Sequence, residues 1–167
     1  MSHMMRGPIA MVVALVVSFG LTAQPSALAA DGEIPQAGRL AEIAALSKQQ
    51  AVPTIVFVSR DACPYCRALR NSILAPMLAA GKFGGRGNLV EVRLDATDPF
   101  SGFEGGLMMA NDFAGQYKAV ITPTLLFLDA DGRELSKRRV GISNLELYGF
   151  YLNQSIDEAL SKLAGRQ

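Results

Sequence analysis

Residues 54–66 of the sequence read Thr-Ile-Val-Phe-Val-Ser-Arg-Asp-Ala-Cys-Pro-Tyr-Cys. The stretch begins with an apolar run rich in β-branched residues, which is typical of a buried strand. A short polar corner follows it, and beyond the cysteines Leu69 and Ile73 recur at helical spacing. Cys63 and Cys66, the only two cysteines in the chain, are therefore predicted to lie where a strand leads into a helix.

A pair of thiols at the start of a helix favours redox chemistry. The free N–H groups of a first helical turn and the helix dipole stabilise negative charge, so we expect the pKa of Cys63 to fall below the ordinary value of about 8.5. Pro64 suits the first helical position, where its missing N–H would have had no partner. The expected reaction is attack by Cys63 on a substrate disulfide, followed by resolution of the mixed disulfide by Cys66.

Two other roles for the cysteine pair fit its spacing less well. A disulfide that closes so small a loop restricts the unfolded chain little, so it would be a weak structural crosslink. A structural zinc site needs four ligands, and the chain offers one CxxC pair and a single histidine, His3. We therefore expect no metal and no organic cofactor, because the Cys63–Cys66 dithiol itself carries two electrons.

The overall composition is that of a single neutral domain. The chain has 167 residues, with 16 Lys and Arg against 15 Asp and Glu, and no basic patch that would indicate a nucleic-acid partner. Basic residues at 137–139 give a predicted edge strand a polar character that discourages strand addition. We expect a monomer.

The N-terminal segment is predicted to be a secretory signal peptide. Arg6 precedes an apolar run over residues 9–22, and Ala-Leu-Ala at 27–29 has the small-x-small form of a cleavage site. Residues 1–29 would then be removed, with residues 1–4 interpreted as a tag remnant or an alternative start. The alternative is an uncleaved anchor, but the apolar run is shorter than the roughly 20 residues that span a bilayer. We expect an exported protein with no membrane anchor after cleavage.

Periodicity along the rest of the chain predicts alternating helices and strands. The expected elements are a helix over 36–50, a strand over 52–58, a helix over 64–80 that Pro76 kinks or divides, a strand over 89–95, a helix over 107–118, strands over 124–128 and 134–140, and a last helix that Asn144 caps and that buries Leu147, Phe150, Tyr151 and Ile156. The helix between the first two strands implies parallel pairing, and the turn at Asp131-Gly132 implies an antiparallel pair. The predicted fold class is α/β, with a four-stranded mixed sheet flanked by helices.

Residues 96–109 have two interpretations. Residues 96–106 are loop-like and rich in glycine, and in or beside this loop lie Phe100, Phe103, Leu107, Met108 and Met109. These side chains either cap the core or form a docking surface for a partner protein, since Met and aromatic side chains adapt to varied surfaces. We favour the first interpretation, because an exposed patch needs structural proof.

Together these motifs resemble the thioredoxin superfamily. The matching features are Cys63-Pro64-Tyr65-Cys66 after a strand, Thr122-Pro123 before a strand, and the Asp131-Gly132 turn. The resemblance implies a thioredoxin-like domain over residues 52–164, and residues 30–51 before it are interpreted as an N-terminal extension that contains the helix predicted over 36–50. It also implies a cis bond before Pro123, a Thr122 backbone that pairs with the substrate chain, and an approach to the sulfur shaped by Pro64 and Tyr65.

The chain departs from the thioredoxin pattern beneath the dithiol. Thioredoxins have a buried aspartate six residues before the first cysteine, and that position here is Phe57. Glu91, on the neighbouring strand, is a candidate proton acceptor for the resolving thiol, the alternative being a solvent-facing side chain. Arg67 is a candidate for stabilising the Cys63 thiolate, the alternative being an exposed helix arginine of little effect.

The motifs are also similar to those of exported bacterial thioredoxin-like proteins, including those encoded with sulfur-oxidation systems. The resemblance implies a periplasmic thiol–disulfide oxidoreductase that reduces disulfides of specific partner proteins and receives electrons from a membrane donor. Two alternatives stay open. One is an oxidase that donates disulfides, and the other is a non-catalytic binding or regulatory module built on the same fold.

Overall fold

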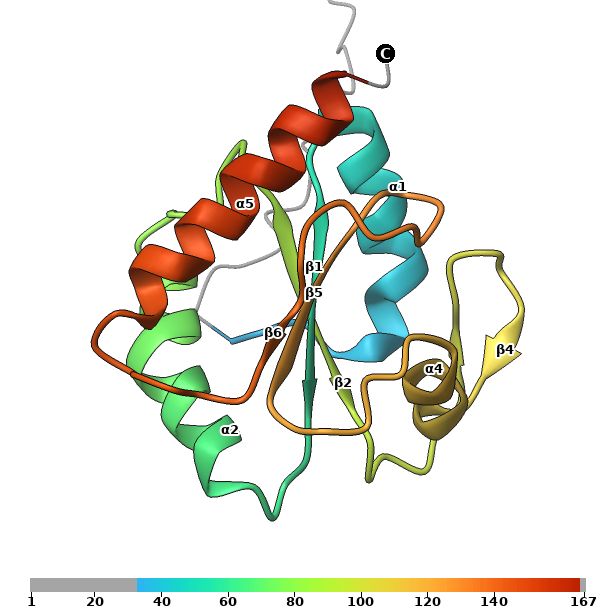
Figure 1. Ribbon diagram of the computed structural model, residues 1–167. Coiled ribbons are helices and arrows are strands. Elements are labelled where there is room, and N and C mark those ends of the chain that lie inside the picture. The colour runs from blue at the N-terminus through green and yellow to red at the C-terminus, as the bar shows by residue number, and fades with distance from the viewer. Residues whose placement is uncertain (1–32, 166–167) are drawn as a thin grey trace, which may run out of the picture.

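A four-stranded mixed sheet forms the centre of the computed structural model, which describes residues 33–165 (Figure 1). The predicted signal peptide, residues 1–29, lies outside the described residues. The sheet contains β1 (Thr54–Ser59), β2 (Asn88–Arg93), β5 (Thr124–Leu128) and β6 (Arg139–Val140), in the order β2-β1-β5-β6. β1 pairs with β2 in parallel and with β5 in antiparallel, and β6 is antiparallel to β5. The predicted α/β class and mixed sheet are confirmed.

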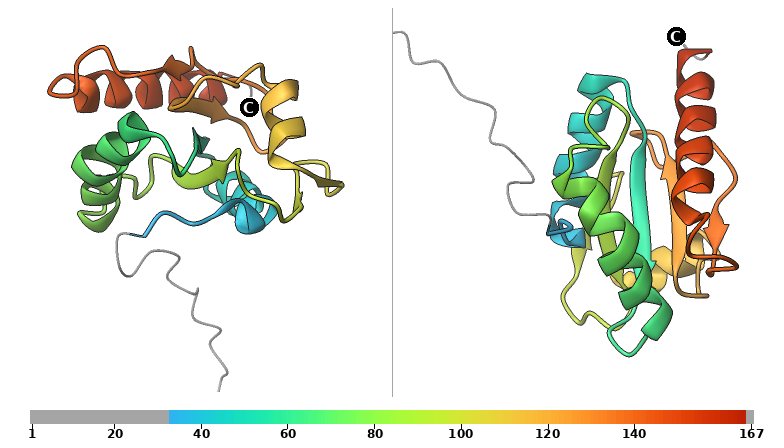
Figure 2. Two further views of the ribbon diagram at one scale, coloured as in Figure 1. Left: turned by 90° about the horizontal axis from the view of Figure 1, so that it is seen from below. Right: turned by 90° about the vertical axis from the view of Figure 1, so that its left-hand side faces the viewer.

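Helices cover both faces of the sheet. They are η1 (Ala37–Arg39), α1 (Leu40–Gln50), α2 (Pro64–Leu69), η2 (Arg70–Leu74), α3 (Ala75–Ala79), α4 (Ala110–Gln116) and α5 (Tyr148–Ala164). In Figure 1 the sheet is seen nearly edge-on, with α2 and α5 on its left and α1 and α4 on its right. The left view of Figure 2 shows the same two helical layers with the strands between them, and the right view looks onto the side of the sheet that α2 and α5 cover.

The central strand β1 contributes to two separate cores. All six of its residues are buried. Ile55 and Phe57 pack on the side of α2 and α5, in the same cluster as both cysteines. Val56 and Val58 pack on the opposite side, against α1 and α4. Full burial of such a side chain contributes about 1.5–3 kcal/mol, so β1 is held firmly from both faces.

The helix after the cysteines is divided, as Pro76 predicted. The α-helical segment α2 passes into the π-helical segment η2, and α3 begins one residue before Pro76. A proline inside a regular α-helix removes one hydrogen bond and clashes with the preceding turn. The wider π turn ahead of Pro76 is a local change in hydrogen bonding of the kind that accommodates such a residue.

The segment over 96–109 is more ordered than predicted. It contains a small antiparallel pair, β3 (Phe100–Ser101) and β4 (Leu107–Met108). The expected helix over 107–118 is therefore shorter, because its first residues belong to β4 and the helix begins at Ala110. Phe100 is buried against α4, which agrees with a core-capping role, whereas Leu107 is 76% exposed.

The predicted strand over 134–140 is also shorter. Glu134 forms an isolated bridge to Leu128, and regular pairing resumes only in β6. Between them the Leu135 N–H still donates to the Phe127 carbonyl of β5 at 2.8 Å, whereas the Ser136 hydroxyl donates to the Ser155 carbonyl on α5 at 2.9 Å. After Leu135 a side-chain contact with α5 thus accompanies the interruption of regular pairing with β5.

The start of the last helix differs from the prediction as well. Asn144 does accept a hydrogen bond, from the Leu147 N–H at 3.0 Å, but it belongs to the turn before the helix, and α5 begins at Tyr148. The buried face of α5 includes Tyr148, Leu152 and Ile156. The predicted burial of Leu147, Phe150 and Tyr151 is wrong, because these residues are 48%, 67% and 37% exposed.

Gly132, in the turn after β5, offers a test of this packing. Its φ of +82° is unfavourable for side-chain-bearing residues, and a Cβ there would lie 2.5 Å from the Tyr117 hydroxyl oxygen. We predict that Gly132→Ala lowers the free energy of unfolding in urea by about 1–3 kcal/mol. The matched control is Gly149→Ala in α5, where a Cβ meets open space and a gain of about 0.5–1 kcal/mol is expected. Equal effects of the two substitutions would contradict the described turn.

Candidate active site

Cys63 and Cys66 form a disulfide at the start of α2, with their Cα atoms 5.2 Å apart. Cys63 is the N-cap residue, with an extended backbone, and Pro64 occupies the first turn as predicted. The Cys63 Sγ accepts a hydrogen bond from the Cys66 N–H at 3.1 Å. Cys66 is fully buried, whereas Cys63 retains 7% exposure. An incoming partner can therefore meet the Cys63 sulfur first.

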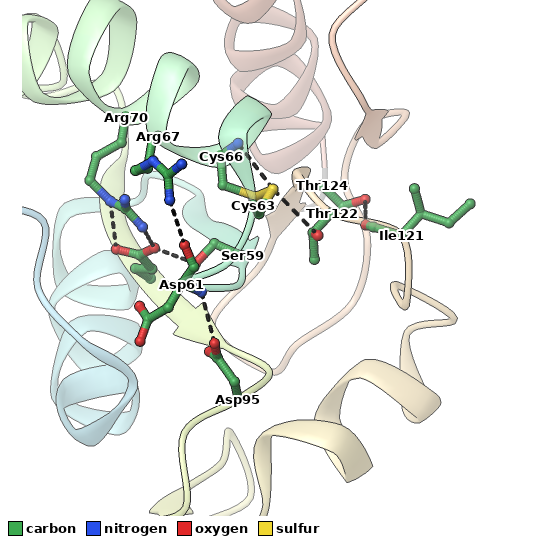
Figure 3. Close-up of a disulfide and its surroundings, with 11 residues drawn as sticks. Ser59, Asp61, Cys63, Cys66, Arg67, Arg70, Asp95, Ile121, Thr122 and Thr124 are labelled. Carbon is green, nitrogen blue, oxygen red and sulfur yellow. Dashed lines mark hydrogen bonds and ion pairs between the residues drawn. A yellow bond between two sulfur atoms is a disulfide. The ribbon is translucent and has the colours of Figure 1, made fainter.

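The loop before β5 lies against this disulfide (Figure 3). The Thr122–Pro123 peptide bond is cis, the form that the family resemblance implies. The Thr122 Oγ1 donates a hydrogen bond to Cys63 Sγ at 3.6 Å. The structure thus brings together four of the predicted site residues, namely Cys63, Cys66, Thr122 and Pro123.

Exposed apolar side chains lie on the two segments that meet at the disulfide. Tyr65, on α2, is 65% exposed, and Val120 and Ile121, which precede the cis bond, are 61% and 62% exposed. Only Tyr65 was among the predicted site residues. Side chains of this kind are suited to contact with a partner chain.

Polar contacts fix the turn that leads into Cys63. The Asp61 N–H donates to the Asp95 carboxylate at 2.8 Å, and the Asp61 carboxylate pairs with Arg93 at 3.0 Å. Arg67 Nη1 donates to the Asp61 carbonyl at 3.0 Å (Figure 3). Arg67 therefore braces this turn, and its effect on a Cys63 thiolate stays a prediction.

Glu91 is buried beneath the dithiol. Its side chain is only 2% exposed, so the solvent-facing alternative is wrong. Its carboxylate forms an ion pair with Arg70 and also accepts hydrogen bonds from the Ser59 hydroxyl and from Gln36 Nε2. The role of Glu91 as a proton acceptor stays a prediction. An acceptor at this position would be a carboxylate that already has three hydrogen-bonding partners.

Sequence reasoning missed the partners of Glu91. The β1–β2 register places Glu91 directly beside Phe57, the position that bears aspartate in thioredoxins. The Arg70 guanidinium carbon lies 5.5 Å from the centre of the Phe57 ring, a cation–π distance. One available signal was that Arg70 follows Cys66 by four residues and so shares its helix face.

A pocket of about 230 Å³ opens beside this ion pair. Its lining includes Gln36, Arg70, Glu91 and Arg93. The buried carboxylate is thus next to a polar space that reaches the protein surface. Such a space is suited to proton exchange between Glu91 and solvent.

A model of the thioredoxin-like domain matches residues 40–154. The chain belongs to the thioredoxin-like family. The match begins within the segment described above as an N-terminal extension. No curated protein matches the chain.

Solved structures of the thioredoxin-like fold resemble the chain over most of its length. A DsbH oxidoreductase is 24% identical, with 86% of this chain and 95% of that chain covered and a TM-score of 0.57. A poplar thioredoxin h mutant is 17% identical, with coverages of 83% and 92% and a TM-score of 0.55. Thioredoxin O2 from Arabidopsis thaliana in its oxidised state is 14% identical, with coverages of 74% and 94% and a TM-score of 0.51. At these identities the similarity shows the fold.

The family and the Cys63–Cys66 disulfide together support thiol–disulfide oxidoreductase chemistry in general. A thioredoxin-like fold places a strand end, a helix start and a cis-proline loop around one CxxC pair. The chain has each of these parts at the positions described above.

The Arg70–Glu91 ion pair can be tested by removing one partner. Arg70→Met would leave the buried Glu91 carboxylate without its counter-ion, so we predict a loss of about 3 kcal/mol or more in the free energy of unfolding. Adding Glu91→Leu to this variant removes the unpaired buried charge and should restore much of the lost free energy of unfolding. Urea unfolding of the oxidised protein at neutral pH measures both. A loss below about 1 kcal/mol, the usual value for surface pairs, would contradict the buried geometry.

Proposed function

We propose that the protein is a periplasmic thiol–disulfide oxidoreductase that reduces the disulfides of specific partner proteins. The observation that supports it best is the contact between the Cys63 sulfur and Thr122, next to the cis-proline. This contact places Cys63, which is 7% exposed whereas Cys66 is fully buried, beside a loop that can pair with an extended chain. The CxxC motif alone would not supply such a substrate position.

In the proposed reaction the reduced Cys63 thiolate attacks one sulfur of the partner's disulfide. A Cys63–partner disulfide forms, and the other partner sulfur leaves as a thiolate. The Cys66 thiolate then attacks Cys63 Sγ, the internal disulfide forms again, and the partner leaves with two thiols. Two electrons pass from the protein to the partner. The Cys66 N–H and the Thr122 hydroxyl are positioned to stabilise charge on Cys63.

The proposed direction of electron flow and the proposed periplasmic location are both inferred from the sequence. The Pro64-Tyr65 dipeptide between the cysteines suggests a potential between those of strong reductants and strong oxidants, so we favour a reductase. The signal-like segment over 1–29 supports export, and an exported reductase needs a membrane electron donor, as in the proteins encoded with sulfur-oxidation systems. Within residues 33–165 no helix is both long and apolar enough to span a membrane.

A non-catalytic binding module is the second candidate. Leu107 on β4 is 76% exposed and Met109 is 38% exposed, so the segment over 96–109 offers apolar contact area away from the cysteines. A binding module needs no activated thiol. Rapid alkylation of reduced Cys63 by iodoacetamide at about pH 6 would favour the oxidoreductase, and slow alkylation would favour the module.

Insulin reduction with dithiothreitol as electron source tests the proposed function. We predict that Cys63→Ser lowers the rate to the uncatalysed level, because the attacking sulfur is lost. Cys66→Ser is the matched control: it keeps the attacking thiol, loses the resolving one, and should accumulate a mixed disulfide that mass spectrometry detects. Wild-type activity in Cys63→Ser would contradict the proposal.

A further inference from the structure

A second pocket, of about 160 Å³, lies between β6 and the start of α5. Its lining residues are Lys137, Arg138, Arg139, Val140, Gly141, Ser143, Tyr148 and Tyr151. All three charged residues in this set are basic. A pocket with such a lining favours a negatively charged group.

Hydrogen bonds to neutral groups hold the Arg139 side chain in the lining of this pocket. Its Nε donates to the Ser155 hydroxyl at 2.9 Å, and its Nη2 donates to the Tyr151 carbonyl at 3.0 Å. Its guanidinium carbon lies 5.2 Å from the Tyr151 ring centre. Arg138 differs, because it forms an ion pair with Glu134. Within residues 33–165 no acidic side chain forms a salt bridge with Arg139, so its charge is held in place without neutralisation.

Tyr148 gives an independent indication of a ligand. It is only 5% exposed, yet its hydroxyl has no hydrogen-bond partner in the described part of the chain. A buried polar group without a partner is costly and uncommon. Burial raises the pKa of Tyr148 to about 12, against the opposing effect of Arg139, so the hydroxyl is a neutral donor at physiological pH.

The pocket adjoins the substrate side of the dithiol. Val140, which lines it, pairs with Thr124 in β5, and the Gly141 N–H donates to the Pro123 carbonyl at 2.8 Å. Tyr148 packs in the same core cluster as both cysteines. In Figure 1 the chain from β6 to α5 passes close to the end of the molecule at which α2 begins. A chain bound along the cis-proline loop would therefore pass near the pocket.

We propose that this pocket binds a carboxylate of the disulfide-containing partner, with Arg139 supplying the charge and Tyr148 a hydrogen bond. The inference rests on the proposed function and narrows its substrate class to disulfides with an acidic side chain or chain terminus nearby. The carboxylate selects the partner, and the sulfur chemistry stays with the cysteines.

The test uses two peptide disulfides that differ only by Asp or Asn near one cysteine. We expect kcat/KM for the Asp peptide to exceed that for the Asn peptide by about tenfold, the effect of one charge-assisted contact. This ratio should fall to near one in Tyr148→Phe and in Arg139→Gln. The matched control is Arg133→Gln, which removes an exposed positive charge outside the pocket and should leave the ratio unchanged. Loss of the ratio in all three variants would overturn the proposal in favour of general electrostatic attraction.

A binding measurement separates this proposal from the proposed function. The oxidised protein is titrated with the Asp peptide in which both cysteines are replaced by serine, and the amide signals of Gly141 and Ser143 are followed by NMR. Shifts that weaken in Tyr148→Phe support the pocket even if no disulfide is reduced. Equal turnover of the two disulfides overturns the pocket and leaves the oxidoreductase intact. Shifts with inorganic phosphate but none with the peptide also overturn it, since the site would then take free anions.

Discussion

The position of the reactive sulfur depends on the double-sided burial of β1. Its alternate side chains enter two different cores, so the strand cannot rotate or slide without exposing one of them. The turn that follows is tied to the end of β2 through Asp61, Asp95 and Arg93. Cys63 comes two residues after Asp61, so the contacts that fix this turn against the sheet also constrain the orientation of Cys63.

Beneath the disulfide the chain uses an unusual arrangement of charge. Phe57 occupies the place of the thioredoxin aspartate, and the buried acid is instead Glu91, one strand away. Its ion pair with Arg70 joins β2 to the CxxC helix, and the Glu91 N–H also donates to the Pro35 carbonyl at 2.7 Å. A buried ion pair is weak evidence for stability by itself, because desolvation offsets much of the attraction. Its clearer effect here is to fix the helix, the sheet and the N-terminal segment in one arrangement.

The polar pocket beside Glu91 and the polar pocket beside Tyr148 are lined by different residues. The one beside Glu91 adjoins a carboxylate that already has its hydrogen-bond donors. The one beside Tyr148 contains a tyrosine hydroxyl that has no hydrogen-bond partner within the described residues, and it adjoins the loop on which we propose that a partner chain lies. Partner selection as we propose it, and proton exchange at Glu91 as the sequence predicts it, would therefore use separate groups of residues.

Local features of the site could be predicted from the sequence, whereas tertiary ones could not. The strand before Cys63 and the helix start at Pro64 follow from short-range patterns, and the structure confirms both. The Arg70–Glu91 pair could not be predicted, because it depends on the register between β1 and β2. The predicted extent of the strand over 134–140 and the predicted burial of Phe150 were wrong, because packing against α5 interrupts the strand pairing and determines which face of α5 is buried.

The reduction potential of the Cys63–Cys66 couple, measured against glutathione, tests the central claim most directly. It reports the relative stability of the dithiol and the disulfide, which sets the direction of electron flow. The account predicts a value of about −200 mV or below, within the range of thioredoxin- and glutaredoxin-like reductants. A value of about −120 mV would contradict it, because the protein would then donate disulfides to its partners.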